Sequence, residues 1–130
     1  ETVASMRAGP RPTASELAPY LGEWLGEYSI NENARWRGGL RLRLDGDTVV
    51  AQIVDYRGNV EGVMPVDYIR VVPGGIEFGR MNGMRPMGLV VSEARLVGNA
   101  LEGRQRFRGI VMPLPDGSEP PEVRFRLVRR

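Results

Sequence analysis

The side chains of this sequence that could do chemistry are tyrosines, glutamines and carboxylates, because three other reactive types are missing. There is no cysteine and no histidine, and each of the 18 basic residues is an arginine. These absences exclude a thiol nucleophile, an imidazole base or metal ligand, and Schiff-base chemistry on lysine. We therefore expect no metal site and no cofactor, and any catalysis would depend on hydrogen bonds and proton transfer by these groups.

Three residues are candidates for such catalysis: Tyr28, Gln105 and Glu93. Tyr28 and Gln105 occupy alternate positions in apolar strand patterns, on the side that should face a core. Glu93 is followed two places later by Arg95, so both lie on the same face of a strand. If that face is interior, the two could act as acid and base; the alternative, which we favour, is an ion pair at the surface.

A larger set of aromatic, amide and thioether side chains could bind a ligand inside a barrel. This set is Tyr28, Trp36, Gln52, Tyr56, Tyr68, Met84, Gln105 and Phe107. Gln52, Tyr56 and Tyr68 belong to it only if the register of their strands turns them inward, which the alternation does not decide. Trp36 could instead pack over a barrel edge, Met84 could fill a gap, and the polar groups could hydrogen-bond one another. In an apolar cavity, a few such groups would orient a ligand.

Regularly spaced strands position these residues. Alternating apolar runs between turn signals predict eight strands, at 22–30, 38–44, 48–56, 60–72, 76–81, 87–97, 100–112 and 122–130. Pro65 indicates a bulge or an edge within the fourth strand. Thr13 and Glu16 form a capping-box pattern, which predicts a short helix over roughly 14–21.

The predicted fold is all-β, an eight-stranded antiparallel up-and-down barrel with a short N-terminal helix. Short hairpin connections favour the up-and-down order, and eight strands avoid exposed edges by closing into a barrel. We expect residues 1–12 to form a flexible N-terminal arm and residues 13–130 to form a single β-barrel domain.

Closure places the last strand beside the first, so that the first strand lies between the last and the second. The outward Glu23 and Glu27 should then face rows of arginines on both neighbours. The same pairing brings Arg129 over the inward Trp24, a cation–π contact worth about 0.5–2 kcal/mol. Trp24 and Arg129 are therefore predicted to be structural residues that seal one end of the barrel.

These residues carry a family resemblance. The residues "GEW" at 22–24, with an arginine of the last strand on the tryptophan, resemble the G-x-W signature of the lipocalins. Arg129 would be the matching arginine, with Arg130 as the alternative if the register slips by one. The segment 21–130, which opens with "GEWLGEY" and closes with "RLVRR", is also similar to small bacterial lipocalin-like (calycin-type) β-barrel domains. The resemblance implies a barrel with a ligand cavity.

Three functions are consistent with these residues. The first is lipocalin-like binding of a small, mainly apolar or amphipathic molecule in the barrel cavity. The alternative is a cofactor-independent enzyme, of the cyclase or isomerase type, that uses the same cavity with tyrosine, glutamine or carboxylate groups. The third is an interaction domain with a filled barrel, whose mouth loops contact another protein.

Other partners and the compartment are less defined. The arginines of strand 100–112 do not indicate nucleic acid, because Phe107 and Phe125 point inward and cannot stack on bases. No apolar run approaches the roughly 18 residues of a transmembrane segment. The sequence begins with Glu1, which is compatible with an exported, periplasmic protein as well as with a cytoplasmic one. Whether the chain forms a homodimer is left open.

Overall fold

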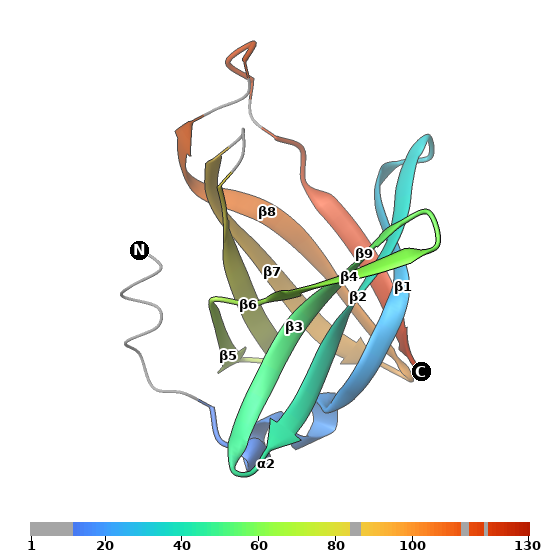
Figure 1. Ribbon diagram of the computed structural model, residues 1–130, viewed down its shortest axis with the longest axis vertical. Coiled ribbons are helices and arrows are strands. Elements are labelled where there is room, and N and C mark those ends of the chain that lie inside the picture. The colour runs from blue at the N-terminus through green and yellow to red at the C-terminus, as the bar shows by residue number, and fades with distance from the viewer. Residues whose placement is uncertain (1–11, 84–86, 113–114, 119) are drawn as a thin grey trace.

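The computed structural model describes residues 12–83, 87–112, 115–118 and 120–130, and its fold is all-β. A single antiparallel sheet follows an up-and-down path and curls into a half-barrel, with a short helix at one end (Figure 1). Its strands are β1 Gly22–Asn31, β2 Ala34–Asp45, β3 Thr48–Arg57, β4 Val60–Pro65, β5 Tyr68–Val72, β6 Gly75–Asn82, β7 Met87–Val97, β8 Ala100–Met112 and β9 Val123–Arg129. The order β4-β3-β2-β1-β9-β8-β7-β6-β5 places β1 between β9 and β2, as the sequence predicts.

The structure corrects the prediction of an eight-stranded closed barrel. The predicted fourth strand is divided into β4 and β5, which are the two edges of a nine-stranded sheet, so the barrel is not closed. Pro65, which has no N–H to donate, ends β4. The chain then changes partner: the N–H of Val66 donates to the carbonyl of Ala51 on β3 (3.2 Å), and the N–H of Asp67 to that of Gly79 on β6 (2.8 Å).

The predicted helix covers one end of the half-barrel (Figure 1). It consists of one α-helical turn, α2 (Ala14–Leu17), followed by a 3₁₀ turn, η1 (Ala18–Tyr20). The predicted capping box is present, because Thr13 and Glu16 each accept a hydrogen bond from the backbone N–H of the other. Leu17 is fully buried in the core of the sheet, so this short helix is held by packing rather than by its length.

Trp24 fills the same end of the half-barrel. It is 1% exposed, and its indole N–H donates to the backbone carbonyl of Tyr20 at 2.9 Å. The guanidinium of Arg129 lies 4.3 Å from the indole ring centre and donates to the carbonyl of Pro19 at 2.7 Å. The contact predicted between the first and last strands is therefore confirmed, and it also ties the helix to the sheet.

The apolar core fills the space inside the curled sheet, which we call the lumen, from this end as far as Tyr28 and Phe125. The largest inward side chains with almost no exposed surface are Leu17, Trp24, Leu40, Leu42, Ile76, Phe78, Leu101 and Leu127. We call this the plug half of the lumen, and the opposite end the mouth half.

Ion pairs cover part of the outer face of the sheet. Glu23 pairs with Arg41 on β2 (3.4 Å) and with Arg130, which follows β9 (2.9 Å). Glu27 pairs with Arg35 on β2 (3.3 Å). The predicted outward position of both glutamates on β1 is confirmed, and the partner on the β9 side is the terminal arginine.

Candidate functional site

Aromatic side chains line the mouth half of the lumen. Tyr28 on β1 pairs across the strands with Trp36 on β2, and their rings stack with centres 5.9 Å apart and planes at 15°. The ring of Phe125 on β9 lies 5.0 Å from that of Tyr28. Tyr28 is only 6% exposed, whereas Trp36 is 38% exposed. These three residues form an aromatic wall that extends from the core to the solvent at the mouth.

Tyr28 keeps its hydroxyl proton in this position. Its ring lies across Gly38, where an added Cβ would come within 3.0 Å of a ring carbon. Burial raises the pKa of Tyr28, and the carboxylate of Asp55 raises it further, while Arg80 has the opposite effect. Within the described part of the chain, the hydroxyl has no hydrogen-bond partner. The mouth half therefore contains a neutral phenol that can hydrogen-bond to a guest.

Two charged side chains face the same space. Asp55 is paired with Gly38, which places it on the lumen face of β3 with Ile53. Arg80 follows the core residue Phe78 by two places on β6 and so shares its inward face. The charge of Asp55 raises the pKa of Tyr28 and that of Arg80 lowers it. We call Tyr28, Asp55 and Arg80 the mouth cluster.

The predicted inward positions of Gln105 and Phe107 agree with the pairing of β8. Gln105 lies opposite Ser92, and Phe107 lies opposite Val90, on the face that carries the core residue Leu101. Of the residues predicted to bind a ligand, Tyr28, Trp36, Gln105 and Phe107 thus share the lumen face.

Two other predicted site residues lie on the outer face of β3. Gln52 is paired with Arg41, which is engaged in ion pairs outside the sheet, and the guanidinium of Arg37 lies 4.7 Å from the ring centre of Tyr56. The strand is apolar on both faces, and Val54, on the outer one, is only 1% exposed. This is why alternation alone did not show which face is inward. Met84 lies outside the described residues.

Tyr68 also lies outside the lumen, at the β5 edge. Its ring covers Gly79 on β6, and its hydroxyl donates to the buried carboxylate of Glu77 at 3.1 Å. Arg70 pairs with the same carboxylate at 2.8 Å. Burial raises the pKa of Tyr68, and the charge of Glu77 adds to this effect. These contacts fasten β5 to β6, which is a structural role.

Glu93 is separated from the other two catalytic candidates. It lies on the outer face of β7, whereas Tyr28 and Gln105 face the lumen. Its partners are three arginines of β8: Arg104 (4.0 Å), Arg106 (3.2 Å) and Arg108 (3.3 Å). The interpretation of Glu93 as part of a surface ion pair is confirmed, although with β8 rather than with Arg95.

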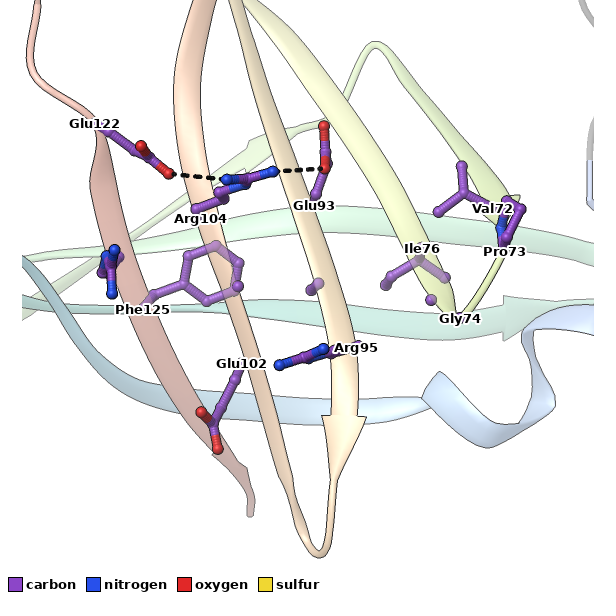
Figure 2. Close-up of a pocket in the computed structure, with 14 residues that line it drawn as sticks. Val72, Pro73, Gly74, Ile76, Glu93, Arg95, Glu102, Arg104, Glu122 and Phe125 are labelled. Atoms are coloured by element: carbon purple, nitrogen blue, oxygen red, sulfur yellow. Dashed lines mark ion pairs between the residues drawn. The ribbon is translucent and has the colours of Figure 1, made fainter.

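A hollow of about 580 Å³ lies along the β5–β6 turn and β6 to β9 (Figure 2). Its lining includes the lumen-facing Ile76 and Phe125 as well as outward charged side chains. The charged residues around it are Glu93, Arg95, Glu102, Arg104, Glu122 and Arg124. Figure 2 shows Arg104 between Glu93 and Glu122, at 4.0 and 3.7 Å. Acids and bases are equal in number, and Arg104 is already paired on both sides. We therefore place the candidate ligand site in the mouth half of the lumen instead.

Comparison with family models, curated proteins and solved structures gave no match for this chain. Over the residues that the structure describes, no cluster of three or more acidic side chains is arranged to hold a metal ion. No helix in the described ranges is long and apolar enough to cross a membrane. A functional assignment therefore depends on the geometry of the site itself.

Proposed function

We propose that this chain binds a small, mainly apolar molecule in the mouth half of its lumen, in the manner of a lipocalin-like protein. The apolar body of the guest would pack on the aromatic wall. The mouth cluster would provide a small number of polar contacts. An apolar pocket with a few convergent polar groups is the usual composition of a small-molecule site.

The state of Tyr28 is the observation that carries this proposal. The ring of Tyr28 is buried against Trp36 and Phe125, whereas its hydroxyl is not among the buried atoms that lack a partner and is therefore open to solvent. Among the described residues the hydroxyl has no protein partner, so it is available to a guest that enters the mouth. A guest with a polar group would accept a hydrogen bond from it.

The same geometry favours binding over the enzymatic alternative. The raised pKa of Tyr28 makes it a poor base near neutral pH, and Glu93 does not face the lumen. Asp55 faces the lumen, and one of its carboxylate oxygens accepts a hydrogen bond from the N–H of Tyr56 at 2.9 Å. Within the described part of the chain, an enzyme acting on the lumen face would have to use Asp55 as its carboxylate.

Titration with the neutral fluorescent probe N-phenyl-1-naphthylamine tests the proposal. We expect saturable binding that Trp36→Ala weakens by roughly tenfold, the effect of losing one aromatic contact and its buried area. Tyr56→Ala is the matched control, because it removes an aromatic ring from the outer face and should leave the affinity unchanged. Fluorescence that rises without saturation, or equal losses in the two variants, would contradict a lumen site.

A further inference from the structure

The hollow shown in Figure 2 does not suit an apolar guest, because six charged side chains line it, but its arginines suit an anion. Three arginines contribute to the lining: Arg95 on β7, Arg104 on β8 and Arg124 on β9. Arg104 and Arg124 are directly opposite each other in neighbouring strands, on the outer face of the sheet. Like charges in opposite positions destabilise a sheet. The fold therefore holds two cations together at the edge of a hollow of about 580 Å³.

The carboxylates of the hollow leave these three arginines largely unpaired. Within the described residues, Arg95 and Arg124 have no carboxylate within 4.0 Å. Arg104 lies 4.0 Å from Glu93 and 3.7 Å from Glu122, as Figure 2 shows. Both distances exceed the roughly 3.2 Å of a hydrogen bond from nitrogen to oxygen. The N–H groups of Arg104 are thus attracted to the two acids without being hydrogen-bonded to them.

The surface around the hollow carries an excess of positive charge. Glu93 also pairs with Arg106 at 3.2 Å and with Arg108 at 3.3 Å, and Glu102 pairs with Arg126 at 3.7 Å. Over the outer face of β7 to β9, the arginines are at 95, 104, 106, 108, 124 and 126, and the glutamates at 93 and 102, with a third at 122 just before β9. Such a surface attracts anions to the hollow within it.

The chemistry of the guanidinium group favours a phosphate group as that anion. A guanidinium donates two parallel hydrogen bonds to phosphate oxygens, and a phosphate can accept them from arginines on different strands at once. The volume of the hollow lies in the range of small-molecule sites, about 300–1,000 Å³. The aromatic residues of β8 and β9, Phe107 and Phe125, face the lumen, so the bases of a nucleic acid would have no ring of these strands to stack on.

We propose that the hollow binds a phosphate group between Arg104 and Arg124, with Arg95 as a third donor from β7. The bound phosphate would replace the repulsion between the two opposite arginines by hydrogen bonds to both. A soluble phosphate ester and a phospholipid headgroup share this chemistry. The site lies on the outer face of the sheet, so this inference does not rest on ligand binding in the lumen.

Titration of the wild-type protein with inorganic pyrophosphate tests the site directly. The ¹H–¹⁵N NMR spectrum is recorded at pH 7.5 and constant ionic strength, with acetate as the comparison anion. We expect the amide signals of Gly103 and Arg124 to shift and saturate, and pyrophosphate to bind roughly tenfold more tightly than acetate, as one further charge-assisted hydrogen bond would give. Shifts that do not saturate, or equal affinities for the two anions, would overturn the proposal.

Arginine variants locate the preference for phosphate. Arg124→Met should weaken pyrophosphate binding by roughly tenfold, the loss of one charged hydrogen bond, and Arg95→Met should weaken it less. Arg43→Met is the matched control, because it removes an exposed arginine from the outer face of β2 with the same change in net charge. Equal losses in Arg124→Met and Arg43→Met would show an effect of net charge alone and would overturn the site.

Removing a competing carboxylate should have the opposite effect. Glu122→Gln takes away one of the two acids beside Arg104, so pyrophosphate should bind more tightly to this variant than to the wild type. Weaker binding by Glu122→Gln would contradict a phosphate at Arg104. Because Glu122 lies outside the strands and is exposed, this variant is expected to fold even if Arg124→Met does not.

Sedimentation with vesicles of equimolar phosphatidylcholine and phosphatidic acid distinguishes the two sources of phosphate. Co-sedimentation that Arg124→Met abolishes and Arg43→Met preserves would identify a lipid headgroup, and saturable binding of pyrophosphate without co-sedimentation would identify a soluble compound. If neither is observed, the phosphate site is wrong, whatever the result of the N-phenyl-1-naphthylamine titration. Failure of that titration alone would contradict the proposed function and leave the phosphate site in place.

Discussion

The two halves of the lumen are lined by the same alternating strands, yet their polar groups differ in whether they have hydrogen-bond partners. In the plug half, the indole N–H of Trp24 and the guanidinium of Arg129 are each satisfied by a backbone carbonyl. In the mouth half, the hydroxyl of Tyr28 and the Nε of Arg80 have no partner among the described residues. Structural polar groups are normally paired, and the proposed binding function predicts that the unpaired groups of the mouth half contact a guest.

Replacing each of the two tryptophans by alanine should give the largest difference in unfolding free energy between the two halves. We expect Trp24→Ala to cost about 3–5 kcal/mol of unfolding free energy, because it empties the sealed end of the core. Trp36→Ala should cost less than about 1 kcal/mol, since Trp36 is partly exposed. Urea denaturation curves measure both changes, and a similar loss in the two variants would show that the mouth half is as tightly packed as the plug half.

Replacing the two inward arginines by methionine sharpens the contrast. Arg129→Met should lower the unfolding free energy by about 1–2 kcal/mol, because it removes a cation–π contact and a hydrogen bond. Arg80→Met should leave stability unchanged or raise it, because it removes a buried donor that has no partner. Thermal unfolding distinguishes the two, and a marked loss of stability in Arg80→Met would indicate a structural role.

The smallest effect is expected for Tyr28→Phe at neutral pH, where the hydroxyl makes no hydrogen bond among the described residues. At alkaline pH the unfolding free energy of the variant should be higher than that of the wild type. The pKa of Tyr28 is raised in the folded state, so above about pH 10 the unfolded chain releases a proton that the folded chain keeps. The stability of the wild type then falls by up to about 1.4 kcal/mol per pH unit for this residue.

Urea midpoints at pH 9 and pH 11 measure this difference. Tyr68 has a raised pKa as well, so Tyr28→Phe should remove only part of the alkaline loss, and Tyr68→Phe another part. Identical pH dependence in the wild type and in Tyr28→Phe would mean that the pKa of Tyr28 is not raised in the folded state.

The strands and most of their pairing could be predicted because they depend on local signals. Two-residue alternation and turn glycines gave boundaries within a few residues, and the antiparallel register then brought Arg129 onto Trp24. The division of the predicted fourth strand could not be foreseen, because it depends on where β3 and β6, distant in sequence, lie in space.

The composition of the site was harder to predict than the fold. Tyr28 and Gln105 were placed correctly because their strands have one clearly apolar face. Asp55 was missed because Val54 makes the outer face of β3 as buried as the inner one. Arg80 was missed because an inward arginine contradicts the rule that charged residues face water, and such exceptions tend to mark functional positions.

The two indole N–H signals in a ¹H–¹⁵N NMR spectrum provide the most direct test of a ligand site in the mouth half. The chain has two tryptophans, one buried with its N–H bonded to Tyr20 and one at the mouth. On titration with N-phenyl-1-naphthylamine, the Trp36 signal should shift and reach saturation while that of Trp24 stays in place. A Trp36 signal that does not move, or a saturable shift of Trp24 alone, would contradict the account.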